Sequence, residues 1–143
     1  MVPSNAPETP NAGPEPSDSN RQTTVLVVDD APVDRVMTGA IIEQMPGWRA
    51  LYAESGEEAL AAIAREQPRI ILTDLNMPKM DGLELLAAVK QSPDWTRLPV
   101  VMITTEAGEG HVVQALSSGA RGYIRKPFSP DQIRERIIPL LQG

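Results

Sequence analysis

The sequence contains no cysteine and only one histidine, His111, among its 143 residues. The first absence excludes disulfide bridges and thiolate metal sites, and the second excludes a metal site built from several histidines. No apolar run approaches the roughly 20 residues that a membrane-spanning helix needs. The first residues also lack the charged and then apolar pattern of a secretory signal. A cytoplasmic location is therefore expected.

The chain also has little positive charge. It carries 13 lysines and arginines against 19 acidic residues, for a net charge of −6, and its basic residues form no stripe. General affinity for nucleic acid is therefore not expected, because such binding depends on clustered cations facing phosphates. The length favours one domain that is large enough to bury a hydrophobic core.

Residues 1–22 differ in composition from the rest of the chain. They hold five of the fourteen prolines, together with Ser, Asn, Glu and Thr, and only Met1 and Val2 are apolar beyond alanine. Such a segment cannot bury enough surface to offset its ordering entropy. We predict a disordered Pro/Ser-rich tail over residues 1–22 and one folded domain over residues 23–143.

Short apolar runs alternate with helical patterns through that domain. The runs predict strands over 25–28, 48–53, 69–73, 98–103 and 121–125, of which the second is more amphipathic and suits an edge. Between them apolar residues recur at helical spacing, and Ser55 and Ser129 are plausible N-caps. The first helical pattern consists of Val33, Val36, Met37, Ala40, Ile41 and Met45.

Five strand–helix units in about 120 residues predict an α/β fold, a doubly wound parallel sheet with helices on both faces. Crossovers are right-handed, so the carboxyl ends of all strands lie at one edge, where open α/β sheets bind ligands. The pair Asp29-Asp30 ends the first strand, Asp74 the third, Thr104 the fourth and Lys126 the fifth.

These side chains suit metal-assisted phosphoryl transfer. Carboxylates that cluster repel one another unless a cation binds, and oxygen ligands without His or Cys favour Mg²⁺. Asp74 can accept a phosphoryl group as an acyl phosphate. Thr104 can donate its hydroxyl to one phosphoryl oxygen, and Lys126 offers a point charge to another. The bond between Lys126 and Pro127 is a candidate cis peptide.

The chain resembles the receiver domains of response regulators in bacterial two-component systems, with the single-domain CheY type as the nearest form. The resemblance covers residues 24 to 142 and rests on the spacing and residues of four motifs. These are Val-Val-Asp-Asp (27–30), Asp-Leu-Asn-Met-Pro-Lys-Met-Asp-Gly (74–82), Met-Ile-Thr-Thr-Glu (102–106) and Gly-Tyr-Ile-Arg-Lys-Pro-Phe (122–128). It implies a flavodoxin-like (βα)5 sheet with strand order 2-1-3-4-5.

The resemblance also implies the chemistry of the site. Asp74 would become a 4-aspartylphosphate, with a sensor histidine kinase or a histidine phosphotransfer protein as donor. Asp30 would bind Mg²⁺ directly and Asp29 mainly through water, while Asp74 and the backbone carbonyl of Asn76 would complete the ligand set. Lys126 would hold the phosphoryl group.

The same resemblance assigns a switch. Thr104 would move toward the phosphoryl group and Tyr123 would follow, which reshapes the face formed by the predicted fourth helix, fifth strand and fifth helix. Side chains at Asn76 and Glu106 would gate the attacking water and tune the phosphate lifetime. No output domain follows Gly143, so the expected output is protein binding in a phosphorelay, and no enzymatic activity beyond self-phosphorylation and autodephosphorylation is expected.

Two other classes fit parts of the pattern. A pseudo-receiver scaffold binds partners without phosphorylation, but such proteins typically lose an acid, the threonine or the lysine, and this chain retains all of them. A haloacid dehalogenase phosphatase also uses an aspartyl nucleophile, but it needs a second carboxylate where this chain has Asn76.

Overall fold

The computed structural model describes residues 23–105 and 109–141, in which strands and helices alternate strictly. The strands are β1 (Thr23–Val28), β2 (Trp48–Ala53), β3 (Ile70–Asp74), β4 (Val100–Thr104) and β5 (Gly122–Arg125). The helices are α1 (Pro32–Glu43), α2 (Gly56–Glu66), α3 (Gly82–Gln91), α4 (Glu109–Ser117) and α5 (Pro130–Leu141). The five predicted strand–helix units are confirmed. The predicted tail and Glu106 lie outside the described residues.

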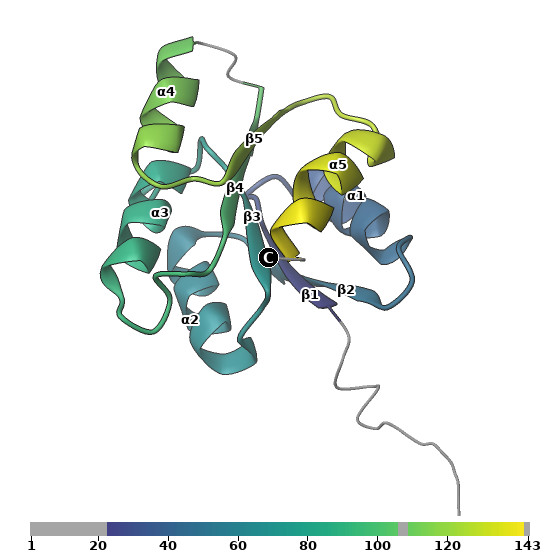
Figure 1. Ribbon diagram of the computed structural model, residues 1–143, viewed down its shortest axis with the longest axis horizontal. Coiled ribbons are helices and arrows are strands. Elements are labelled where there is room, and N and C mark those ends of the chain that lie inside the picture. The colour runs from purple at the N-terminus through teal and green to yellow at the C-terminus, as the bar shows by residue number, and fades with distance from the viewer. Residues whose placement is uncertain (1–22, 106–108, 142–143) are drawn as a thin grey trace, which may run out of the picture.

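The strands form one parallel sheet in the order β2-β1-β3-β4-β5 (Figure 1). The predicted fold class and strand order are therefore confirmed, and β2 is an edge strand as its amphipathic pattern indicated. The central strands β1, β3 and β4 are almost wholly buried. This burial on both faces explains why they are continuous apolar runs in the sequence.

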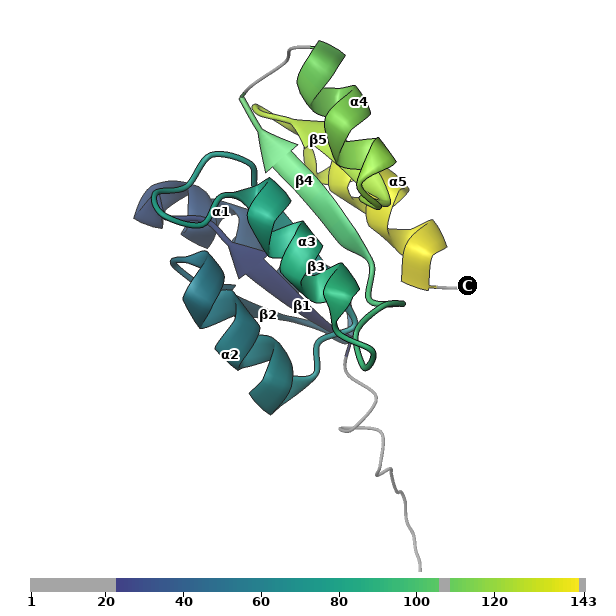
Figure 2. The same ribbon diagram turned by 90° about the vertical axis from the view of Figure 1, so that its left-hand side faces the viewer.

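Helices cover both faces of the sheet. Figures 1 and 2 show α1 and α5 on one face and α2, α3 and α4 on the other. Each face has its own core: Ile42, Ile133 and Ile137 pack on the α1/α5 side. The other side contains Ala59, Ile63, Leu85, Leu86, Val89 and Ala115. These two layers fix the sheet and leave the ends of its strands open to ligands.

Helix α1 departs from the simplest interpretation of its sequence pattern. The predicted helix forms, but four members of its apolar pattern are exposed, namely Val33, Val36, Met37 and Ala40. The buried residues of α1 are instead Thr38, Gly39 and Ile42. Gly39 lies so close to Tyr52 of β2 that an added Cβ would overlap the tyrosine ring. The close contact with β2 therefore decides which side of α1 faces the sheet.

The two N-caps that the sequence predicts, Ser55 and Ser129, are confirmed. Ser55 accepts a hydrogen bond from the Glu58 N–H at the start of α2, and Ser129 accepts one from Gln132 at the start of α5. Helix α3 begins with a reciprocal capping box between Asp81 and Glu84. Caps satisfy N–H groups that the first helical turn leaves without partners. They fix where each helix leaves the strand-end edge.

Candidate functional site

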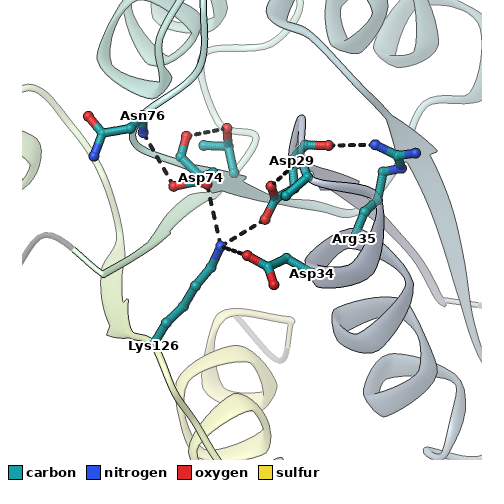
Figure 3. Close-up of polar contacts among 8 residues, drawn as sticks. Asp29, Asp34, Arg35, Asp74, Asn76 and Lys126 are labelled. Atoms are coloured by element: carbon teal, nitrogen blue, oxygen red, sulfur yellow. Dashed lines mark hydrogen bonds and ion pairs between the residues drawn. The ribbon is translucent and has the colours of Figure 1, made fainter.

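Side chains from three strand ends converge on one ammonium group. Asp29 follows β1, Asp74 is the last residue of β3, and Lys126 follows β5. The Lys126 Nζ lies 2.9 Å from Asp29 Oδ2 and 3.4 Å from Asp74 Oδ2 (Figure 3). The sheet order places β1, β3 and β5 so that their carboxyl ends meet although 97 residues separate Asp29 from Lys126. The sequence prediction that these groups share one edge is confirmed.

The acidic residues form a compact oxygen cluster. One carboxylate oxygen from each of Asp29, Asp30 and Asp74 lies within 4.8 Å of the other two. Asp29 is buried, Asp74 is half-buried and Asp30 is exposed. Three hard oxygen donors at one open edge, without sulfur or imidazole among them, fit a divalent cation such as Mg²⁺. The side chains present are therefore suited to the predicted metal.

Backbone contacts hold Asp29 in place. Its N–H donates to the Ala53 carbonyl of β2, and its Oδ1 accepts from the Ala31 N–H at 2.9 Å. The Arg35 guanidinium donates to the Asp29 carbonyl at 2.8 Å and so ties α1 to the β1 end. Asp29 therefore presents its second oxygen, Oδ2, to Lys126 from a fixed loop.

Asp74 is positioned by the turn that follows β3. Its Oδ1 accepts a hydrogen bond of 3.3 Å from the Asn76 N–H, and its backbone carbonyl accepts one from the Thr73 hydroxyl. Gly82 passes close to the same backbone: an added Cβ would lie 2.5 Å from the Asp74 carbonyl oxygen. No L side chain fits that approach without movement of the backbone. Gly82 in the motif 74–82 thus allows α3 to start directly behind Asp74.

Burial and charge act in opposite directions on the two central groups. Burial is the largest influence on Asp74 and raises the pKa of its carboxyl group, although Lys126 partly offsets this. Burial lowers the pKa of Lys126, but its hydrogen bonds to Asp29 and Asp34 and the charge of Asp74 together raise that pKa above its ordinary value. The lysine is therefore held in its cationic form, and Asp74 is less fully solvated than a surface carboxylate.

The remaining predicted residues flank this centre. Thr104 is fully buried at the end of β4, and its carbonyl accepts a 2.9 Å hydrogen bond from the Lys126 N–H. Tyr123 is half-buried opposite Met102 of β4 and packs against the core on the α2/α3/α4 side. The Lys126–Pro127 peptide bond is cis, as the sequence suggested. Thr104 and Tyr123 thus lie on the adjacent strands β4 and β5, where Thr104 pairs with Arg125 and Tyr123 with Met102.

One residue of the site was missed by the sequence interpretation. Asp34, in the first turn of α1, places its Oδ2 3.0 Å from Lys126 Nζ (Figure 3). Three carboxylates therefore share this ammonium, from Asp29, Asp34 and Asp74. A signal was available in the sequence, because a helix that begins directly after the β1 end has its first turn at the same sheet edge.

Known proteins resemble the chain in sequence. The sequence model of the response regulator receiver domain family matches residues 25–138. A chemotaxis protein CheY homolog of Campylobacter jejuni is 36% identical over 118 residues, which cover 82% of this chain and 91% of that protein. Chemotaxis protein CheY1 of Helicobacter pylori is also 36% identical, over 82% of this chain and 95% of its own length.

Solved structures show the same fold. Chemotaxis protein CheY4 of Vibrio cholerae aligns with a TM-score of 0.78 at 31% identity, over 84% of this chain and 99% of that one. A putative response regulator from Chloroflexus aurantiacus aligns with a TM-score of 0.80 at 30% identity, over 85% and 98% of the two chains. No helix among the described residues is long and apolar enough to cross a bilayer. With the converged acids and lysine at the predicted edge, these matches place the chain in the response regulator receiver domain family, as a CheY-like member.

Proposed function

We propose that this chain is a phosphorylation-dependent switch. In this proposal, Asp74 accepts a phosphoryl group from the phosphohistidine of a sensor histidine kinase or histidine phosphotransfer protein. The observation that carries the proposal is the convergence of Asp29, Asp30, Asp74 and Lys126 from three separate strand ends. The three carboxylates can hold a cation, and the Lys126 ammonium lies beside Asp74, where it can offset the charge of a phosphoryl group on that residue. Membership of the receiver family supports the same activity.

The transfer forms one bond and breaks one. A carboxylate oxygen of Asp74 attacks phosphorus, the P–N bond to the donor imidazole breaks, and the imidazole nitrogen keeps the electron pair. Lys126 donates to one phosphoryl oxygen, and the Thr104 hydroxyl donates to another. In the reverse direction of the switch, water attacks phosphorus and releases inorganic phosphate, which restores the Asp74 carboxylate. In this proposal the chain accepts and then hydrolyses its own phosphoryl group, and it acts on no separate substrate.

A Mg²⁺ ion suits the acidic cluster in this reaction. Asp29, Asp30, Asp74 and the backbone carbonyl of Asn76 would hold it, and when bound it neutralises charge on the phosphoryl oxygens. The roles of the protein groups are to orient and to balance charge. Asp74 is fixed by the Asn76 N–H, and Asp29 is fixed by the β1 loop. Without a divalent cation, the three carboxylates would repel an anionic donor.

The output of the switch would be protein binding on the α4–β5–α5 face. In this proposal Thr104 moves toward the phosphoryl group and Tyr123 follows. Exposed apolar side chains on α4, Val113 and Leu116, support this assignment. A shallow pocket of about 310 Å³ lies on the same face, lined by Val112, Tyr123, Ile124, Arg125, Gln132 and Arg136. A partner with an apolar and acidic surface would suit it.

The proposed phosphorylation is tested by intact mass. Incubation with acetyl phosphate and Mg²⁺ is expected to add about 80 Da, the mass of one phosphoryl group. A chelator is expected to prevent this gain, because the acidic cluster then repels the donor. If neither acetyl phosphate nor a purified histidine phosphotransfer protein adds mass, phosphorylation is contradicted. A phosphorylation-independent scaffold would then be the better description of the chain.

The proposed switch is tested on the two tyrosines of the chain. Beryllofluoride with Mg²⁺ serves as a stable mimic of the phosphoryl group. In protein with labelled tyrosine rings, we expect the NMR signal of Tyr123 to move when the mimic binds. Tyr52 lies on β2, the edge strand farthest from β5, and its signal should stay unchanged. An unchanged Tyr123 signal with the mimic bound would contradict the role of this residue.

A further inference from the structure

We propose that Asp34 is a positioning residue that competes with the phosphoryl group for Lys126. In the unphosphorylated protein it holds the ammonium on the α1 side of the site. When Asp74 is phosphorylated, Lys126 must leave Asp34 for the phosphoryl oxygens. The inference rests on the proposed function, because it concerns how the same site responds to phosphorylation.

The geometry around Lys126 shows the competition. A lysine ammonium has three N–H donors. Lys126 Nζ has three carboxylate neighbours, at 2.9 Å from Asp29, 3.0 Å from Asp34 and 3.4 Å from Asp74. The proposed acceptor has the longest of these contacts. The donors are thus already used before any phosphoryl group arrives, and one of the two shorter contacts is to Asp34, which lies outside the acidic cluster.

Asp34 is held at the site independently of Lys126. The residue lies in the first turn of α1, where the helix dipole favours a carboxylate. Arg35, the next residue, anchors this turn through its contact with the Asp29 carbonyl. The Asp34 side chain is 45% exposed, whereas that of Lys126 is only 11% exposed. The carboxylate therefore reaches the lysine from the rim, where water can replace the lysine when it leaves.

The three carboxylates differ in what they can do after phosphorylation. Asp74 carries the phosphoryl group, and Asp29 belongs to the acidic cluster that suits a cation. Asp34 is outside that cluster, and its only hydrogen bond to a side chain among the described residues is to Lys126. Its negative charge opposes an incoming anionic donor and draws the lysine away. Asp34 therefore raises the barrier to phosphorylation and does not take part in the chemistry.

The first test is the rate of phosphorylation of Asp34→Asn by acetyl phosphate with Mg²⁺ present. Removal of the competing charge is expected to raise the second-order rate constant about fivefold at low ionic strength. The gain should shrink at high salt, because screening weakens the effect of a half-exposed charge. Asp34→Glu, which keeps the charge, should stay near the wild-type rate. Asp94→Asn makes the same charge change at an exposed residue on the opposite edge of the sheet and should have no effect.

The second test follows Lys126 directly. The chain has only three lysines, Lys79, Lys90 and Lys126, so the side-chain NMR signals of labelled lysine can be resolved. With Mg²⁺ present, Asp34→Asn should move the Lys126 signal in the free protein. In the beryllofluoride-bound protein, the wild-type and variant signals should coincide, because Lys126 has then left Asp34. A purely structural role of Asp34 would not produce this dependence on the mimic.

The outcomes separate this inference from the proposed function. If the wild-type protein gains no phosphoryl group, the proposed function fails and the inference fails with it. If the wild type is phosphorylated but Asp34→Asn reacts at the same rate, the inference alone is overturned. The inference is also overturned if the Lys126 signals of the wild type and Asp34→Asn differ by the same amount in the free and the beryllofluoride-bound proteins. The lysine would then keep Asp34 as a partner when the mimic is bound.

Discussion

Asp74→Asn is expected to lose the whole mass gain of about 80 Da, with a fall in the phosphorylation rate of at least about a thousandfold. An amide oxygen carries no full negative charge and does not form an acyl phosphate under these conditions. The other carboxylates cannot easily replace Asp74. Asp29 already directs one oxygen to the Ala31 N–H and the other to Lys126. Intact mass and peptide mapping after acetyl phosphate treatment measure the loss.

A matched control for this variant lies seven residues away. Asp81→Asn makes the same chemical change in the same segment, and asparagine caps a helix about as well as aspartate. Asp81 is the N-cap of α3 and contacts no part of the ammonium cluster. The Asp81→Asn protein should therefore be phosphorylated like the wild type. A phosphoryl group found on Asp29 or Asp30 of Asp74→Asn would show that the acceptor is wrongly assigned.

Asp74→Asn should be more stable than the wild type. That result would exclude unfolding as the reason for its failure to accept a phosphoryl group. The Asp74 pKa is raised in the folded protein, mainly by burial. Ionising Asp74 therefore costs more in the folded state than in the unfolded state. As the pH rises from the ordinary pKa through the raised pKa, the wild type loses stability that a variant without this carboxyl group keeps. Asparagine avoids that loss, so we expect Asp74→Asn to have a higher free energy of unfolding than the wild type at pH 7. Urea unfolding should show that the gain disappears toward pH 3.

Lys126→Met is expected to lower the free energy of unfolding by about 3 kcal/mol in the absence of Mg²⁺. Methionine keeps much of the apolar stem but leaves three carboxylates without their shared cation. The side chains of Asp29 and Asp74 are only 5% and 13% exposed, so water cannot fully replace the ammonium. The raised pKa of Lys126 means that its stabilising effect is complete at neutral pH and lost only in alkali above the ordinary lysine pKa.

Urea unfolding with and without Mg²⁺ measures this loss. Added Mg²⁺ should recover part of it, because binding to the acidic cluster stabilises the folded state by mass action. Lys79→Met is the control: Lys79 is exposed and makes no ion pair among the described residues, so stability should change by less than about 0.5 kcal/mol. A loss in Lys126→Met no greater than in this control would show that the three carboxylates do not depend on the lysine.

The sequence by itself determined the architecture. Strands buried on both faces are apolar at most positions, so runs such as Val25–Val28 identify the centre of a parallel sheet. The alternation with helical patterns then gives the crossovers, and right-handed crossovers bring the strand ends to one edge. Asp29, Asp74 and Lys126 could therefore be grouped without coordinates. Some boundaries moved by one or two residues, as at β4, where the Leu98 carbonyl accepts from Lys90 before the ladder begins.

Only the tertiary structure decided which face of α1 is buried and which acids reach Lys126. Hydrophobic periodicity indicated a helix over Val33–Met45, but it could not show that Gly39 against Tyr52 would turn much of the apolar stripe outward. The Arg35 contact with the Asp29 carbonyl holds the first turn of α1 beside the end of β1, where Asp34 reaches the ammonium. Periodicity reports on residues that are close along one helix. A salt bridge between residues 92 positions apart depends on how two elements pack, which is decided by the whole sheet.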